Sequence, residues 1–146
     1  AKIMSLQEPT KKMSKSDENT NAFITILDDK DTIVRKFKRA ITDSDMEIRY
    51  GEGKDGINNL LTIYSVVTGK TIAEAEAEFS GKGYGDFKLA VGEAVADHLK
   101  PVRERFAELR SDKGQLESFY HAGADKALYT SQKTLSKVYK KIGLIR

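Results

Sequence analysis

Two lysines and two serines near the start of the chain have the spacing needed to bind a polyphosphate. Lys12 and Lys15 lie three residues apart, and Ser14 and Ser16 stand beside them. A lysine ammonium stabilises phosphate oxygens as a compact charge on a long stem, and small hydroxyl groups donate hydrogen bonds to the same oxygens. Carried on a loop, this set could close over a triphosphate and neutralise the charge that develops on a departing pyrophosphate. An ordinary solvated turn has the same composition.

The segments around this run predict a short extended arm. Residues 1–6 form an apolar stretch typical of a strand end, and residues 7–20 are polar and rich in turn formers. Residues 23–27, Phe-Ile-Thr-Ile-Leu, predict a second short strand or extended segment. Because six residues cannot form a sheet alone, the first strand predicts a sheet whose other members lie elsewhere.

From about residue 29 onward the pattern becomes helical. Asp28 or Asp29 can cap a helix whose apolar residues repeat at intervals of three and four: Ile33, Val34, Phe37 and Ile41. Residues 49–56 contain three glycines and predict a long flexible loop. A second amphipathic helix follows over 57–67 and is closed by Gly69.

Three further helical segments follow. Thr71 and Glu74 form a capping-box pattern at the start of a short helix that runs to Phe79. A connector with Gly81, Gly83 and Gly85 leads to a long helix that we expect Asp86 to cap, and two more helical stretches follow with a break at Gly123. The predicted fold class is mainly α, a bundle of five or six helices preceded by a short strand-loop arm.

Composition limits the classes of function. The 146 residues include 39% hydrophobic and 32% charged residues, as expected for a soluble globular protein, and no apolar run has the roughly 18–20 residues of a membrane helix. There is no cysteine, which suits a reducing cytoplasm. With only two histidines, we expect no protein-bound metal site.

The charge distribution allows a nucleic-acid partner without requiring one. The net charge is +3, and the basic residues form two clusters. The first comprises Arg35, Lys36, Lys38 and Arg39, and the second comprises Lys133, Lys137, Lys140, Lys141 and Arg146. Either cluster could meet a phosphate backbone, but solvated helix faces have the same composition, and that second interpretation is favoured.

The run from Lys12 to Ser16 matches the KMSKS signature of class I aminoacyl-tRNA synthetases. The wider string of residues 11–19, KKMSKSDEN, most resembles the bacterial tryptophanyl branch of that class. Residues 1–4 resemble the last strand segment of the catalytic domain in this family, and residues 56–61 resemble the start of its helical domain. Gly143-Leu144, after a basic helix, is similar to the natural C-terminus of the family.

This resemblance implies a domain plan and an activity. Residues 1–28 would be the C-terminal end of a Rossmann-type catalytic domain with its signature loop, and residues 29–146 would be a helical domain that binds the tRNA anticodon. Enzymes of this family activate tryptophan with ATP to tryptophanyl-adenylate and then transfer it to the cognate tRNA. Mg²⁺ enters with the nucleotide.

The resemblance also implies roles for individual residues. Lys12 and Lys15 would be the catalytic residues that contact the phosphates, with Lys15 the stronger candidate for stabilising pyrophosphate. The backbones of Met13 and Ile3 would lie against adenine. The complete predicted ATP-binding set is Ile3, Lys12, Met13, Ser14, Lys15 and Ser16.

Parts of the family pattern are absent from these residues. The histidine-containing first signature, the tryptophan pocket and most of the parallel sheet do not occur here. We therefore expect a C-terminal fragment that is inactive alone, binds no cofactor by itself and is monomeric. The full enzyme would be a cytoplasmic homodimer.

Two alternatives stay open at this point. The chain could be a helical RNA- or protein-binding module whose basic loop only touches phosphates, or part of a class I synthetase with another amino-acid specificity. Tyr50 and Phe119 are candidates for stacking on RNA bases, although helical aromatic residues belong more often to the core.

Overall fold

The computed structural model describes residues 2–144 as five α-helices joined by irregular segments, so the predicted mainly α fold class is confirmed. Within those residues the only β pairing is a single bridge. The helices are α1 (Lys30–Lys38), α2 (Asp55–Thr68), α3 (Ile72–Glu78), α4 (Tyr84–Ser111) and α5 (Lys113–Lys141). The chain forms two compact units, Ala1–Arg103 and Glu104–Arg146.

Side-chain caps determine where α1 begins. The Asp29 carboxylate accepts a hydrogen bond of 2.7 Å from the backbone N–H of Thr32, which satisfies one of the free donors at a helix start. The helix ends at Lys38, so the predicted extension to Ile41 is wrong. Ile41 lies outside the helix with 51% of its surface exposed, because the chain turns away after Arg39.

The predicted ends of α2 and α3 are confirmed. Gly69 closes α2 in the left-handed conformation, at a φ of 75° that glycine adopts without strain. Thr71 and Glu74 form both bonds of a capping box at the start of α3. The expected cap at Asp86 is wrong, because α4 already begins at Tyr84 and Asp86 lies in its first turn.

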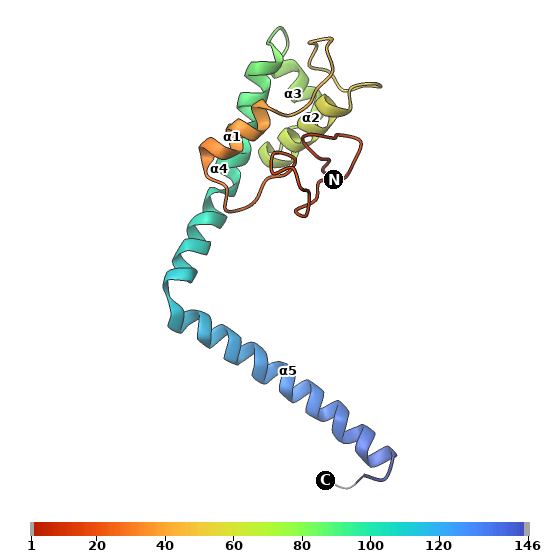
Figure 1. The fold of residues 1–146 in the computed structure, drawn as a ribbon, viewed down its shortest axis with the longest axis vertical. Helices are drawn as coiled ribbons and strands as arrows, with labels where there is room; N and C mark the ends of the chain where they lie inside the picture. The colour runs from red at the N-terminus through yellow and green to blue at the C-terminus, as the bar shows by residue number, and fades with distance from the viewer. Residues whose placement is uncertain (1, 145–146) are drawn as a thin grey trace. The chain divides into compact units, whose positions relative to one another are not determined.

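The first unit has one hydrophobic core, to which the first four helices and the segments between them contribute. Figure 1 shows how these four helices are arranged. Its centre is an aromatic cluster in which Phe79 lies 5.3 Å from Tyr64 and 4.9 Å from Phe87, measured between ring centroids. The close approach of α1 to α4 depends on Gly92, since a Cβ there would lie 3.0 Å from Cα of Val34. These contacts fix the helices that support the N-terminal arm.

The N-terminal arm packs into this core. Leu6 is 1% exposed, its N–H donates to the carbonyl oxygen of Ala22, and its own carbonyl oxygen accepts from the N–H of Ile41. Of the two alternatives predicted for residues 23–27, a short strand or an extended segment, the strand is wrong, because residues 26 and 27 lie in a turn. Thr25 and Asp28 close a turn there through a 2.8 Å side-chain bond, so the β-branched run has a local alternative to strand pairing.

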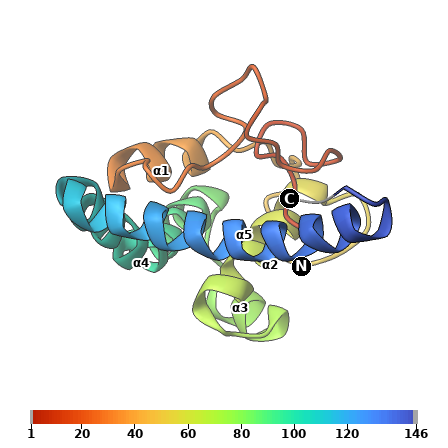
Figure 2. The same cartoon turned by 90° about the horizontal axis from the view of Figure 1, so that it is seen from below.

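The second unit comprises the end of α4 and the whole of α5. Figure 2 shows α5 as one unbroken helix, so the predicted break at Gly123 is wrong. Glycine costs a helix only about 1 kcal/mol, which does not interrupt a long one. The actual break is at Asp112, whose side chain caps α5 by accepting from Gln115 N–H.

The first four helices share one core, and α5 belongs to the second unit. No residue of α5 is buried, whereas α1 to α4 all contribute to the core of the first unit. Across the described residues, 2–144, no helix is both long and apolar enough to cross a membrane.

Candidate nucleotide-binding loop

A short antiparallel stem carries the lysine-bearing turn. Met4 and Lys12 form the single bridge. On either side of it, the N–H of Ser5 donates to the Lys11 carbonyl oxygen at 2.8 Å, and the N–H of Met13 donates to the Ile3 carbonyl oxygen at 3.1 Å. The strand predicted over 1–6 is thus reduced to this stem within the described residues.

Hydroxyl and carboxylate groups shape the turn that follows. The Ser14 hydroxyl accepts from the N–H of Ser16 at 3.2 Å, and the Ser14 carbonyl oxygen accepts from the N–H of Asp17. The Asp17 carboxylate in turn accepts from the N–H of Asn19 at 2.9 Å. The turn is therefore organised by its own small polar side chains, which leaves the lysines outside this network.

The two signature lysines are exposed and uncompensated. Lys12 and Lys15 both lie at the surface, and in the described part of the chain neither ammonium group pairs with a carboxylate. The adjacent Lys11 differs, because it forms a 2.8 Å ion pair with Glu8, and the hydrogen bond to that carboxylate raises the pKa of Lys11. Two of three neighbouring lysines thus keep their full hydrogen-bonding capacity for a ligand.

The structure places the six predicted ATP-binding residues on this one element. Ile3 and Met13 are half-buried and pack against the core cluster. The remaining four, Lys12, Ser14, Lys15 and Ser16, are exposed on the stem end and the turn. An anchored apolar pair and an exposed polar tip are what a loop needs in order to hold a phosphate-binding group in place.

Sequence reasoning missed the side chain that supports the stem. Asn59, in α2, is 5% exposed and binds both polar groups of Met4. Its Oδ1 accepts from the Met4 N–H at 2.9 Å, and its Nδ2 donates to the Met4 carbonyl oxygen at 2.8 Å. The signal in the sequence is an asparagine on the apolar face of a helix, where a polar residue needs a buried partner.

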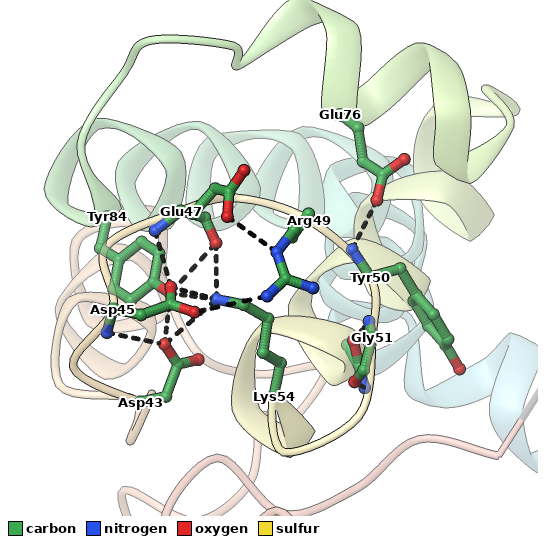
Figure 3. A network of polar contacts seen from close by, with 10 residues as sticks. Asp43, Asp45, Glu47, Arg49, Tyr50, Gly51, Lys54, Glu76 and Tyr84 are labelled. Atoms are coloured by element: carbon green, nitrogen blue, oxygen red, sulfur yellow. Dashed lines mark hydrogen bonds and ion pairs between the residues drawn. The ribbon is translucent and has the colours of Figure 1, made fainter.

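A second lysine-centred cluster was also missed (Figure 3). Lys54 is 2% exposed, although the sequence predicted a flexible loop over 49–56. Its ammonium donates to four oxygen atoms: Asp43 Oδ1 at 3.2 Å, Glu47 O at 2.8 Å, the Tyr84 hydroxyl at 3.0 Å, and Asp45 Oδ1. The signal was three acidic residues at alternate positions, 43, 45 and 47, ahead of one lysine.

Electrostatics in this cluster favour the charged lysine. Burial alone would lower the pKa of Lys54, but hydrogen bonds to Asp45, Tyr84 and Asp43 outweigh it and raise that pKa. The bond from Lys54 holds the pKa of Asp45 at about 2, and burial raises the pKa of Tyr84 to about 12. All three groups are therefore locked in one protonation state near neutral pH.

The same cluster fixes the loop over residues 43–54. Tyr50 N–H donates to the carboxylate of Glu76 in α3, and Gly51 N–H donates to Asn58 in α2. Met46, at the loop tip, is held at a φ of 62°, which a non-glycine residue rarely adopts. With its lysine ammonium already bound by protein oxygens and three acidic residues around it, this cluster holds the loop in place and is not suited to binding a phosphate.

The first basic cluster exposes three of its four members: Arg35, Lys38 and Arg39. Lys36 is 6% exposed and forms a 2.6 Å ion pair with Asp28, so it cannot contribute to an external patch with Arg35, Lys38 and Arg39. Over residues 2–144 no group of three or more histidine or acidic side chains could hold a metal ion.

Comparison with known protein families identifies the family of the chain. The family model described as "tRNA synthetases class I (W and Y)" matches residues 1–100. The chain belongs to this family of class I aminoacyl-tRNA synthetases. The matched residues include the signature turn and nearly all of the first unit.

Several individual relatives are tryptophan–tRNA ligases. The chain is 49% identical to the tryptophan–tRNA ligase of Oceanobacillus iheyensis, over 100% of its own length and 45% of the relative. It is 51% identical to the ligase of Listeria monocytogenes, over 100% of its own length and 44% of the relative.

Two solved structures of tryptophanyl-tRNA synthetases are also similar to the chain. The tryptophanyl-tRNA synthetase of Mycoplasma pneumoniae superposes with a TM-score of 0.78 and 33% identity, covering 99% of this chain and 46% of that one. The Campylobacter jejuni enzyme, solved with ADP and tryptophan, gives 0.76 and 28%, covering 99% and 44%. The chain thus spans less than half the length of these relatives.

Proposed function

We propose that this chain is the C-terminal part of a tryptophan–tRNA ligase, which activates tryptophan with ATP and transfers it to the cognate tRNA. The observation that carries the proposal is a pair of exposed, uncompensated lysines on a turn whose stem is anchored in the core. Sequence identities of 49% and 51% with two tryptophan–tRNA ligases support tryptophan as the amino-acid substrate. Residues 1–28 would end the catalytic domain, and residues 29–146 would form the anticodon-binding domain.

The proposed chemistry needs charge stabilisation more than covalent participation. The tryptophan carboxylate attacks the α-phosphorus of ATP, a mixed carboxylic–phosphoric anhydride bond forms, and the bond to pyrophosphate breaks. Negative charge moves onto the departing β- and γ-phosphates. Lys12 and Lys15 would donate to those oxygens, and Lys15, at the turn, would meet the pyrophosphate as it leaves.

The other four residues of the loop would orient the nucleotide. The Met13 and Ile3 backbones, fixed by their mutual hydrogen bond, would lie against adenine. Ser14 would hold the shape of the turn, as it does here through Ser16 N–H. Mg²⁺ would arrive bound to the nucleotide phosphates and water.

The tRNA would meet the helical part of the chain. On α5, four exposed lysines share one face by their spacing of seven, four and three residues: Lys126, Lys133, Lys137 and Lys140. No acidic residue occurs between 126 and 141. Such a basic stripe suits a phosphate backbone. Tyr50 and Phe119 are 54% and 53% exposed, so both are accessible for base stacking.

The proposal includes an assembly and a location. The full enzyme would be a cytoplasmic homodimer, and this chain alone would be monomeric and inactive in tryptophan activation. The chain covers less than half the length of its relatives. We therefore assign the binding of ATP, tryptophan and tRNA to the full enzyme and not to this chain alone.

The direct test is amino-acid-dependent exchange of pyrophosphate into ATP by the full-length protein that contains this sequence. We expect exchange with tryptophan alone among the standard amino acids. Exchange with a different amino acid would refute the specificity, and no exchange with any of them would refute the activity.

A second candidate, an RNA-binding module, is favoured by the lysine stripe on α5. It predicts salt-dependent RNA binding by the 146-residue chain that does not change in the Lys12→Ala/Lys15→Ala variant. It also predicts that the full-length protein has no exchange activity, which separates it from the first.

A further inference from the structure

The stem pairs residues 3–5 with residues 11–13. The backbone N–H and C=O of Met4 take no part in this pairing. The bonds that join the two halves come from Ser5 and Met13, the neighbours of the Met4–Lys12 bridge. In antiparallel pairing, the residue between two such bonds directs its own N–H and C=O to the opposite side. Met4 would therefore carry a free donor and a free acceptor if no other element met it.

One side chain of α2 satisfies both groups. The carboxamide of Asn59 presents an acceptor and a donor with the same spacing as a peptide group, and it takes the place that a further strand would occupy. Its bonds to Met4, of 2.9 and 2.8 Å, join residues 55 apart in sequence. At 5% exposure there is no bulk water to replace them.

The adjacent asparagine makes the same pair of bonds to another segment. Asn58 Oδ1 accepts from the Gly51 N–H at 3.0 Å, and Asn58 Nδ2 donates to the Gly51 carbonyl oxygen at 2.7 Å. Gly51 belongs to the loop held by Lys54 and not to the signature stem. Two consecutive residues of one helix thus clamp two separate segments, which makes Asn58 a matched control.

We propose that Asn59 is a positioning residue for amino-acid activation, which sets the place of Lys12 and Lys15 by holding Met4. The inference rests on the proposed function. Because Met4 is bridged to Lys12, and Ile3 is bonded to Met13, a shift of Met4 moves the base of the turn. Lys15 lies three residues beyond that base, so its ammonium group moves with it.

The first experiment compares Asn59→Ala with Asn58→Ala in the full-length protein, by tryptophan-dependent exchange of pyrophosphate into ATP. Misplacing a catalytic group by about 1 Å can cost on the order of a hundredfold in rate. We expect kcat to fall by about 10- to 100-fold for Asn59→Ala, with KM for tryptophan little changed. Asn58→Ala should keep kcat within about threefold of wild type. Equal losses in the two variants would overturn the inference.

A double-mutant cycle with Lys15→Ala separates positioning from general loss of structure. If Asn59 acts through the turn, removing it costs much less once Lys15 is gone, so the two effects on kcat are not additive. Additive effects would show that Asn59 has only a structural role and would contradict the proposal. Asn59→Gln keeps both the C=O acceptor and the NH₂ donor of the carboxamide, so it should restore part of the kcat that Asn59→Ala loses. No restoration would count against the proposal.

The folding of the variants is followed in parallel by hydrogen exchange in the full-length protein. Should Asn59→Ala not fold, Asn59→Asp is compared with Asn58→Asp, since each keeps the acceptor and loses the donor. Faster exchange at the Ser5 and Met13 amides only in Asn59→Asp supports the clamp, and unchanged exchange there overturns it. A wild-type protein with no tryptophan-dependent exchange would instead refute the proposed function itself.

Discussion

Two loops of the first unit carry lysine in opposite electrostatic states. In the loop over 43–54, Lys54 is 2% exposed and donates to four protein oxygen atoms. In the signature turn, Lys12 and Lys15 are exposed and have no ion pair among the described residues. A lysine whose charge is satisfied by the protein holds the fold, whereas one left uncompensated at the surface keeps its charge for a ligand.

The largest expected effect comes from the uncompensated side. Lys15→Ala in the full-length protein should lower kcat for adenylate formation by about 100- to 1000-fold, the range seen when one donor to a developing anion is removed. ATP binding should weaken far less, because the charge to be stabilised develops in the transition state. Rapid-quench kinetics and nucleotide titration measure the two quantities.

The control for this variant is Lys11→Ala. Lys11 is already paired with Glu8, so its removal should leave kcat within about threefold of wild type. The comparison between the loops would fail if Lys11→Ala and Lys15→Ala slowed the reaction equally.

Replacing the paired lysine, Lys54, should lower the free energy of unfolding. Lys54→Met in the 146-residue chain removes one partner of a buried ion pair and leaves Asp43 without it, which costs about 3–5 kcal/mol of unfolding free energy. Urea unfolding measures the loss. Lys15→Met should change stability by less than about 0.5 kcal/mol, as exposed substitutions do.

The pKa shifts around Lys54 predict a further, smaller effect at acid pH. Asp45 has its pKa lowered from 3.8 to about 2, so its contribution is fully present above 3.8 and is lost as the pH falls towards 2. Urea unfolding across this range should show stability falling with pH. Asp45→Asn should make the slope shallower, and an unchanged slope would show that the bond to Lys54 does not stabilise the fold.

At alkaline pH the sign is reversed. Tyr84 has its pKa raised from 10.0 to about 12 and Lys54 has its pKa raised above 10.5. Their contribution is therefore complete below pH 10 and is lost as the pH rises through these values. Tyr84→Phe should reduce the alkaline loss of stability, and the measurement is thermal unfolding at a series of pH values.

The smallest effect concerns α5. Gly123 has open space around its Cβ position, so Gly123→Ala should stabilise the helix by about 1 kcal/mol, as followed by far-UV circular dichroism. Gly56→Ala in the first unit is the control with the opposite sign. It should destabilise the fold, because a Cβ there would lie 2.2 Å from the Ile41 carbonyl oxygen. Destabilisation by Gly123→Ala would contradict the continuous helix.

Local chemistry made several elements predictable from sequence. The caps at Asp29, Gly69 and Thr71 act through bonds within a few residues, so each could be recognised without knowledge of the fold. The signature run could be recognised for the same reason, because it is a contiguous set of residue types. Gly123 misled because its small cost in a helix was interpreted as a break.

Long-range contacts decided what could not be predicted. Lys54 meets Tyr84 thirty residues away, and the acidic residues at 43, 45 and 47 ahead of it do not by themselves indicate that its side chain is buried. Asn59 meets Met4 across 55 residues. Residues 23–27 have the composition of a strand, but a strand also needs a partner, and composition does not supply one.

Everything proposed for the loop depends on Lys12 and Lys15 stabilising the negative charge that develops on the departing pyrophosphate. The most direct test is single-turnover formation of tryptophanyl-adenylate by the full-length protein with both lysines replaced by alanine. We predict a rate at least about a hundredfold below wild type, with an unchanged melting temperature because both side chains are exposed. Adenylate formation at the wild-type rate in that variant would contradict the account.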